Sequence, residues 1–193
     1  MIRQNPFGTL ISSGTEGLFA THIPFLIKQT EEGTFVLLAH LARANPHWET
    51  LLQRTEILVI FQGGDAYISP AWYQQHPSVP TWNYVAVHAY GTAEPVEGEE
   101  FRALLMEEIH TFEQGLSQAW EPEFSEEYWE RMMRGIVGVS ITVTRIEGKF
   151  KLSQNRSKEE SRTVREILQN QPEMTKAQQA ASWMERLEKD GEK

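Results

Sequence analysis

Residues 79–91, VPTWNYVAVHAYG, form the stretch that decides the fold predicted from this sequence. From Trp82 onward, successive side chains of a β-strand would point to opposite faces. One face reads as core and carries Asn83, Val85, Val87 and Ala89. The other carries Trp82, Tyr84, Ala86, His88 and Tyr90, a set too aromatic for a solvent face and too polar for a core. Such a face either meets a flat ligand or a second subunit, or packs beneath a helix with its tyrosine hydroxyl groups satisfied at the edge.

Seven further runs have the composition of short strands: 6–12, 18–25, 34–39, 56–61, 66–69, 136–146 and 149–152. Glycine-containing segments at 13–17, 62–65 and 147–148 predict hairpin turns between successive runs. With residues 79–91 these runs make about eight short strands. The sequence therefore predicts a mainly β protein, a small antiparallel barrel rather than a doubly wound sheet.

Helical segments interrupt and follow these strands. Apolar residues recur at helical spacing from Phe101 to Leu116, after Pro95, and a second helix is capped by Ser125 and ended by Gly135. A short helix over 47–53 follows Asn45 as N-cap. Two tail helices open with the capping boxes 157–160 and 175–178, with a break at 169–172.

The organisation expected is one barrel domain over 1–157, with a helical insertion at 98–134 and a helical tail at 158–193. The last helix has a thin apolar stripe: Ala177, Ala181, Met184 and Leu187, with Trp183 beside it. That stripe suits docking on a partner subunit or a loose attachment, and both readings stay open.

Composition excludes several classes of function. A formal net charge of -9 with no run of Lys or Arg disfavours direct binding to DNA. The absence of cysteine excludes disulfides, Fe–S ligation and thiolate zinc sites, and fits a reducing compartment. No segment has the apolar length of a membrane span or a signal peptide, so a cytoplasmic protein is expected.

Motifs of common enzyme classes are missing. The six histidines form no HxH or HExxH pair, so no metal site is expected. There is no nucleophile elbow of the GxSxG type, and neither of the glycine-rich phosphate loops, GxGxxG and GxxxxGK[ST], occurs. A serine hydrolase, an NTPase and a Rossmann dehydrogenase are therefore not expected, and no catalytic residue is assigned.

Polar residues gather instead at the predicted strand ends. Arg43, Lys151 and Arg156 are cations that could clamp a phosphate. The amides of Asn83, Gln154 and Asn155 could read the edge of a heteroaromatic ring. Together they suit a phosphorylated flat cofactor, whereas the plainer alternative makes each a solvated turn residue.

Six motifs resemble those of the PaiB family: NPFGTL (5–10), THIPF (21–25), AHLARANP (39–46), AYISPAWY (66–73), VPTWNYVAVHAYG (79–91) and EGKFKLSQNRS (147–157). The resemblance runs in order from about residue 5 to 168. The final twenty-five residues lie outside the resemblance. Members of this family are described as FMN-binding negative transcriptional regulators.

The resemblance implies a split β-barrel related to the pyridoxamine 5'-phosphate oxidase fold, in a homodimer with FMN in a cleft between the subunits. By analogy with that superfamily, Arg43 contacts the FMN phosphate and His40 faces the ligand. The residues expected to bind the cofactor are His22, His40, Arg43, Asn45, Thr81, Trp82, Asn83, Tyr84, Lys151, Gln154 and Asn155. His88 and Tyr90 are expected at the subunit contact.

Three functions follow from the resemblance and the fold. The first is an FMN-binding regulator that acts indirectly or with a partner. The second is a flavin-dependent oxidoreductase or flavin reductase, because one fold hosts several functions. The third is haem binding through a histidine. Family members generally carry a further segment before NPFGTL, so either the start is shortened or the tail helices take the place of that segment, and the dimer edge stays open.

Overall fold

The computed structural model describes residues 1–15, 17–53, 55–170 and 175–191, with the backbone alone at 175–177 and 190–191. The chain divides into two compact units. Unit 1 consists of Met1, Phe61–Val87 and Glu147–Lys193, and unit 2 of Ile2–Ile60 and His88–Ile146. No helix in these described ranges has the length and apolar character needed to cross a bilayer.

The strands form one seven-stranded sheet in the order β2-β1-β5-β6-β7-β4-β3. Their bounds are β1 Phe7–Gly14, β2 Gly17–Pro24, β3 Leu26–Gln29, β4 Phe35–Ala42, β5 Ile57–Ile68, β6 Thr81–Val96 and β7 Ile136–Lys151. The paired strands β1–β2, β1–β5, β3–β4 and β4–β7 are antiparallel. The three long strands β5, β6 and β7 each contain residues of both units.

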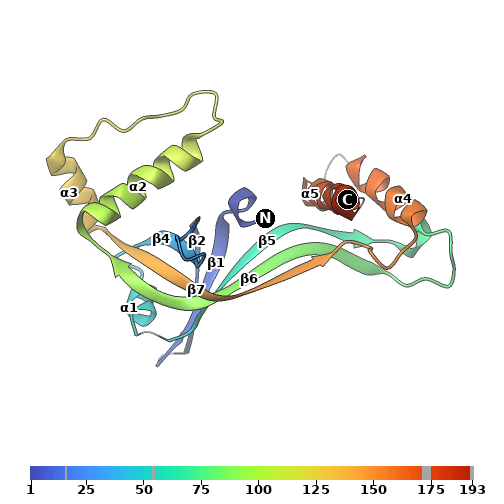
Figure 1. The fold of residues 1–193 in the computed structure, drawn as a ribbon, viewed down its shortest axis with the longest axis horizontal. Helices are drawn as coiled ribbons and strands as arrows, with labels where there is room; N and C mark the ends of the chain where they lie inside the picture. The colour runs from blue at the N-terminus through green and yellow to red at the C-terminus, as the bar shows by residue number, and fades with distance from the viewer. Residues whose placement is uncertain (16, 54, 171–174, 192–193) are drawn as a thin grey trace. The chain divides into compact units, whose positions relative to one another are not determined.

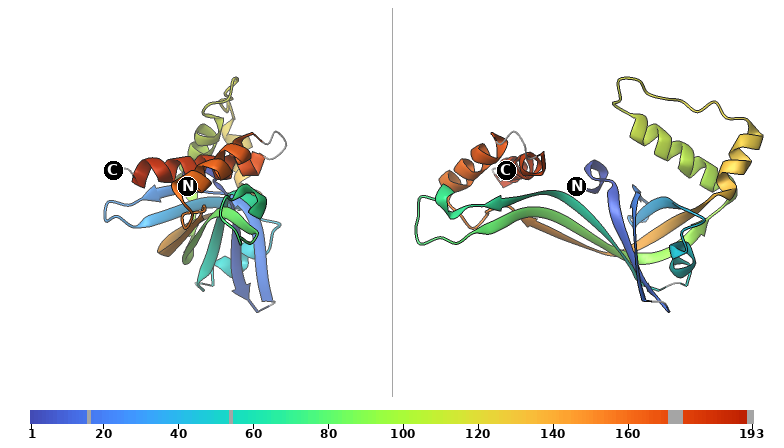
Figure 2. Two further views of the ribbon diagram at one scale, coloured as in Figure 1. Left: turned by 90° about the vertical axis from the view of Figure 1, so that its right-hand side faces the viewer. Right: turned by 180° about the vertical axis from the view of Figure 1, so that it is seen from behind.

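Unit 2 begins with the predicted hairpin, in which β1 pairs with β2 from Phe7↔Pro24 to Gly14↔Gly17 (Figure 2). Gly17 takes a φ of +107°, a conformation that glycine adopts without steric cost. The α-helices of unit 2 are α1 His47–Leu51, α2 Gly98–Glu113 and α3 Glu126–Arg134. A short 3₁₀ turn at Ile2–Gln4 precedes β1. The apolar faces of α2 and α3 pack into one cluster: Leu26, Val96, Phe101, Leu104, Leu105 and Trp129.

Two glycines in unit 2 allow close approach. A Cβ built on Gly91 of β6 would lie 2.2 Å from the carbonyl oxygen of Thr142 on β7. A Cβ on Gly138 of β7 would lie 2.5 Å from the ring of Phe101 on α2. Only glycine fits at either position, so β7 meets β6 and α2 with its backbone.

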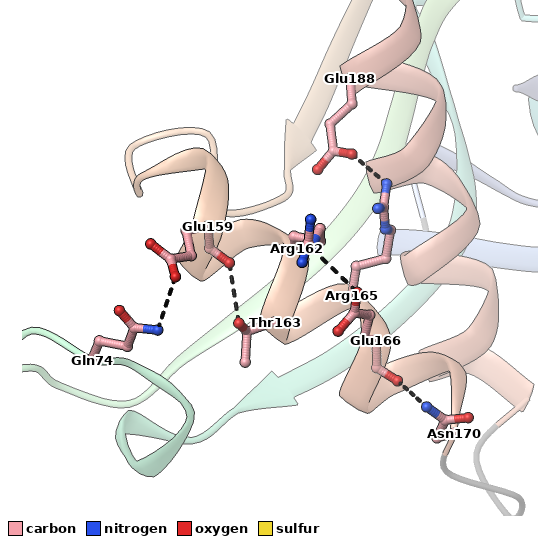
Figure 3. A network of polar contacts seen from close by, with 8 residues as sticks. All are labelled: Gln74, Glu159, Arg162, Thr163, Arg165, Glu166, Asn170 and Glu188. Atoms are coloured by element: carbon pink, nitrogen blue, oxygen red, sulfur yellow. Dashed lines mark hydrogen bonds and ion pairs between the residues drawn. The ribbon is translucent and has the colours of Figure 1, made fainter.

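In unit 1, two helices lie side by side, α4 Lys158–Gln169 and α5 Thr175–Gly191 (Figure 1). Their buried residues share a core with β5, β6 and the end of β7: Ala66, Ile68, Tyr73, Val85, Leu152, Val164, Leu168, Ala180, Ala181 and Met184. Arg165 of α4 makes an ion pair with Glu188 of α5, and Gln74 donates a hydrogen bond of 3.4 Å to Glu159 (Figure 3). The α5 helix is thus docked on its own chain through the face that bears Ala181 and Met184.

Two predicted hairpins are wrong. Residues 56–61 and 66–69 belong to the single strand β5, and residues 136–146 and 149–152 to the single strand β7. The reason lies in the glycines, because neither Gly63 nor Gly148 has the positive φ that a tight hairpin turn requires. Gly63 instead lies under Val85 and Trp183, where a Cβ would meet atoms at 3.1 and 3.3 Å.

Other elements follow the prediction. The helices α2 and α3 form where expected, with the Ser125 side chain accepting from Tyr128 N, and Ser157 caps α4 by accepting from Glu160 N. The strand predicted over 79–91 is β6, and Asn83, Val85, Val87 and Ala89 are its buried face. The four-residue strand β3 was not predicted. The capping box at 175–178 and part of the break at 169–172 lie outside the described side chains.

Candidate functional site

The residues predicted to bind a cofactor are divided between the two units. Unit 1 holds Thr81, Trp82, Asn83, Tyr84, Lys151, Gln154 and Asn155, and unit 2 holds His22, His40, Arg43 and Asn45.

Trp82 and Tyr84 lie on the face of β6 that the helices of unit 1 do not cover. The side chains of Trp82 and of Tyr67, on the neighbouring strand β5, are 53% and 43% exposed. Their ring centroids are 5.9 Å apart in an edge-on contact. A pocket of about 370 Å³ is lined by Gln62, Gly63, Asp65, Trp82, Tyr84, Val85 and Ala86. This face offers flat aromatic surface to a ligand.

Strand alternation sends Thr81 and Asn83 to the opposite face. Lys151 Nζ donates a hydrogen bond to Thr81 Oγ1, which places this cation at the start of β6. Asn83 is fully buried, with its amide nitrogen 3.0 Å from Ser153 Oγ and 3.6 Å from Met184 Sδ. The amide of Asn83 is thereby engaged in the interior of unit 1.

The turn after β7 carries the remaining predicted residues of unit 1. Gln154 Oε1 accepts from Leu152 N at 2.7 Å, and its amide nitrogen donates to Phe150 O. Asn155 is exposed. The guanidinium of Arg156 lies 3.9 Å from the centroid of the Tyr73 ring and donates to Ser78 Oγ at 3.3 Å. Gln154 therefore folds back on the turn, whereas Asn155 is open to a ligand.

In unit 2, Arg43 follows the end of β4 and is joined to the chain that links α3 to β7. Its Nε donates to Arg134 O and its Nη2 to Ile136 O, both at 3.0 Å. Trp48 lies beside the guanidinium, 5.7 Å from ring centroid to Cζ, and donates from Nε1 to Arg43 O. These contacts fix the side chain and leave Nη1 without a hydrogen bond in the described part of the chain.

Arg43 also lines a pocket of unit 2, about 490 Å³ in volume. Its charged lining residues are Arg43, Arg134, Glu97 and Glu130. Apolar lining includes Trp48, Phe101 and Met133. Two guanidinium groups at one pocket are suited to an anionic group of a ligand, although the two carboxylates oppose a high anionic charge.

His40 lies on β4 and contacts α2. Its Nδ1 is 2.7 Å from Oε2 of Glu108, a buried residue of α2. About a third of the His40 side chain is exposed. The other carboxyl oxygen of Glu108, Oε1, is buried and has no hydrogen-bond partner in the described ranges.

Asn45 belongs to a network that the sequence did not predict, centred on His47. The fully buried His47 ring lies between Ser12 Oγ, 2.8 Å from Nε2, and Thr21 Oγ1, 2.7 Å from Nδ1. Asn45 donates from Nδ2 to Thr21 Oγ1 and accepts from His47 N, but the N-cap of α1 is Pro46 and not Asn45 as predicted. Burial lowers the pKa of His47 below its ordinary value. The sequence signal that could have indicated this network is the presence of both THIP (21–24) and NPH (45–47), which supply Thr21, Asn45 and His47.

His22 is exposed on β2, where its ring stacks on Phe7 of β1 with centroids 6.3 Å apart. In the described residues, no three His, Cys, Asp or Glu side chains are grouped in a way that could hold a metal ion. Unit 1 thus offers aromatic rings, the cation Lys151 and the exposed amide of Asn155, and unit 2 offers the open guanidinium edge of Arg43. Each of these groups is of a kind that suits a flat phosphorylated cofactor, which needs stacking surface, cations and edge donors.

Comparison with known proteins places these features in a family. The sequence profile named "Putative FMN-binding domain" matches residues 1–145. Protease synthase and sporulation protein PAI 2 of Bacillus subtilis is 37% identical over 186 residues, which cover 95% of this chain and 88% of that protein.

Two solved structures are similar in fold. The FAD and heme binding protein from Mycobacterium smegmatis has a TM-score of 0.59 at 13% identity, covering 83% of this chain and 72% of that one. The flavocytochrome Anf3 from Azotobacter vinelandii has a TM-score of 0.57 at 15% identity, covering 81% and 67%. These similarities show that the fold is shared, and the seven-stranded sheet with helices is the mainly β architecture that was predicted. The match to the family profile and the identity to PAI 2 together show that this chain belongs to the PaiB family of FMN-binding domains.

Proposed function

We propose that this protein binds FMN and acts as a negative transcriptional regulator of the PaiB type, through a partner rather than by direct contact with DNA. Family membership supports both parts of the proposal. The observation that carries the flavin part is the exposed pair Trp82 and Tyr67 beside a pocket on the open face of unit 1. The free energy falls when a flat ring covers large aromatic side chains that would otherwise be exposed to water.

Each unit carries its own candidate residues for contacts with FMN. Trp82 and Tyr84 would contact the isoalloxazine ring, and the exposed Asn155 and the cation Lys151 supply polar contacts. Arg43 would bind the phosphate through the guanidinium edge left open by its contacts to Arg134 O and Ile136 O. When bound, FMN supplies redox chemistry, and the protein supplies orientation and hydrogen bonds.

The charge of the chain supports an indirect route to gene expression. With a formal net charge of -9, the protein as a whole repels a phosphate backbone. A homodimer in the cytoplasm is part of the proposal, and light scattering of the purified protein tests the dimer. A promoter fragment that shifts with this protein alone at moderate salt would contradict the indirect route.

Titration of the purified protein with FMN, followed by the flavin absorbance and the quenching of flavin fluorescence, tests cofactor binding. Trp82→Leu is expected to weaken FMN and riboflavin alike, by roughly tenfold, because it removes ring contact. Arg43→Gln is expected to weaken FMN but not riboflavin, because only FMN carries the phosphate. Arg162→Gln is the control, since this arginine of α4 is 68% exposed and pairs, among the described residues, only with Glu166 along its own helix. Absence of FMN binding to the unmodified protein would overturn the flavin part.

The alternative function is a flavin-dependent oxidoreductase. The pocket of about 370 Å³ at Trp82 and Tyr84 favours it, because a solvent-open pocket next to a bound ring could admit an electron donor. Oxidation of NADH or NADPH in excess over bound FMN would support this alternative. Its absence would favour the regulator.

A further inference from the structure

Glu108 is a buried carboxyl group that the proposed function does not use. The residue is 4% exposed, on the face of α2 directed at the sheet. Phe101 lies on the same face two turns earlier and packs on Gly138 of β7. Gly138 is the cross-strand neighbour of His40 on β4. The glycine that admits Phe101 thereby also sets α2 at the distance from which Glu108 reaches His40.

The contact between His40 and Glu108 is a single short hydrogen bond. His40 Nδ1 and Glu108 Oε2 are 2.7 Å apart, which is the range of hydrogen bonds between a nitrogen donor and an ionised oxygen. Glu108 Oε1 has no partner in the described residues, so His40 supplies the one hydrogen bond that this buried carboxyl group receives there. In its ionised form Glu108 only accepts hydrogen bonds, and the proton of this contact is then carried by Nδ1 of His40.

The proton on one ring nitrogen determines what the other nitrogen can do. In a neutral imidazole with Nδ1 protonated, Nε2 has a lone pair and no hydrogen. About a third of the His40 side chain is exposed, and Glu108 occupies the Nδ1 side. Nε2 is therefore the ring atom available to a ligand.

We propose that Glu108 is a positioning residue that holds neutral His40 in the Nδ1-protonated tautomer, so that Nε2 accepts a hydrogen bond from an N–H or O–H group of the ligand. The identity of that ligand rests on the proposed function, in which the imide N–H of the flavin ring is such a donor. The tautomer is argued from a contact between two residues of the same unit, so it is tested separately from flavin binding.

Nitrogen–proton NMR correlation of the histidine rings tests this assignment in the full-length protein without flavin, at a pH where the rings are neutral. The His40 signals are identified by their loss in His40→Gln. We expect Nε2 of His40 to have the chemical shift of an unprotonated nitrogen. In Glu108→Leu we expect the shift to move toward that of a protonated Nε2, because the acceptor on the Nδ1 side is gone. Glu107→Gln is the matched control, since it removes the neighbouring carboxylate, which pairs with exposed Lys28.

A protonated Nε2 in the unmodified protein would overturn the proposal, and this reading does not depend on whether Glu108→Leu folds. An unchanged tautomer in folded Glu108→Leu would overturn it as well. FMN titration provides the second readout, in which Glu108→Leu is expected to weaken binding about two- to tenfold, the worth of one hydrogen bond. If the unmodified protein binds no FMN, the proposed function fails, while the NMR result still decides the role of Glu108.

Discussion

Asn83 and Ser153 exchange two hydrogen bonds in the interior of unit 1. Asn83 Nδ2 donates to Ser153 Oγ at 3.0 Å, and Ser153 Oγ donates to Asn83 Oδ1 at 3.1 Å. Both side chains are buried, and Ser153 has a φ of +64°, a conformation unusual for a residue other than glycine. The pair joins the start of β6 to the turn after β7.

Asn83→Ala is expected to lower the free energy of unfolding by about 1–3 kcal/mol, because it leaves the buried Ser153 hydroxyl without this partner. Equilibrium unfolding in urea measures the change. The control is Asn155→Ala, at an exposed position two residues beyond Ser153, which is expected to stay within about 0.5 kcal/mol. Equal effects of the two substitutions would show that the buried pair does not stabilise the turn.

The His47 network predicts a loss of stability in acid. Burial lowers the pKa of His47 from 6.5, so the unfolded chain binds a proton at this site more readily than the folded protein does. The contribution of His47 is therefore constant at high pH, and the free energy of unfolding falls as the pH drops below about 6.5. Urea unfolding over this range measures the slope. His47→Gln should reduce it, and His110→Gln, at an exposed position, should not. A slope unaffected by His47→Gln would contradict the assignment.

Two glycines of β7 provide a matched pair of substitutions. Gly138→Ala would place a methyl group 2.5 Å from the Phe101 ring, and we expect a loss of about 1–3 kcal/mol from overpacking. Gly148→Ala meets no atom closer than 3.4 Å and should leave the stability unchanged or slightly raised. Thermal unfolding followed by circular dichroism compares the two. Similar melting temperatures would mean that α2 moves away from the sheet without cost.

The contact of His40 with Glu108 predicts a non-additive pair of substitutions. His40→Ala leaves the buried Glu108 without its one described hydrogen bond, so we expect a loss of about 1–3 kcal/mol in the free energy of unfolding. The double variant His40→Ala/Glu108→Leu should recover part of that loss, because no buried carboxyl group is left unpaired. A double variant as unstable as the sum of the single ones would count against the coupling.

Most of the fold could be predicted from local patterns, and the two wrong hairpins share one cause. Asn83, Val85, Val87 and Ala89 alternate with less buried neighbours as the sequence indicates, and Ser125 and Ser157 cap the helices expected of them. Gly63 was taken as a turn residue, but it is a strand residue that accommodates Trp183, more than a hundred positions later in the chain. Glycine serves both purposes, and only tertiary contacts distinguish them.

The candidate site was harder to predict, because the neighbours of a side chain decide whether it is available. Asn83 and Gln154 have the chemistry to read a ring edge, yet their amides are occupied by Ser153 and by the backbone of their own turn. Glu108 showed no sign of a special role, since a glutamate on an amphipathic helix is ordinarily solvated. Its burial depends on how α2 meets β4 and β7, which helical periodicity does not specify.

The backbone contact at Gly91 has a consequence for how the strands find their alignment. If β6 slid by two residues along β7, Ala89 or Ala93 would occupy the place of Gly91, and a methyl group would collide with the carbonyl oxygen of Thr142, which lies 2.2 Å from that position. Both alternative alignments keep the apolar residues of β6 on the buried face, so the hydrophobic pattern alone would tolerate them. The missing side chain at Gly91 therefore selects one pairing among several that the pattern permits, and acts against misfolded forms more than in favour of the native one.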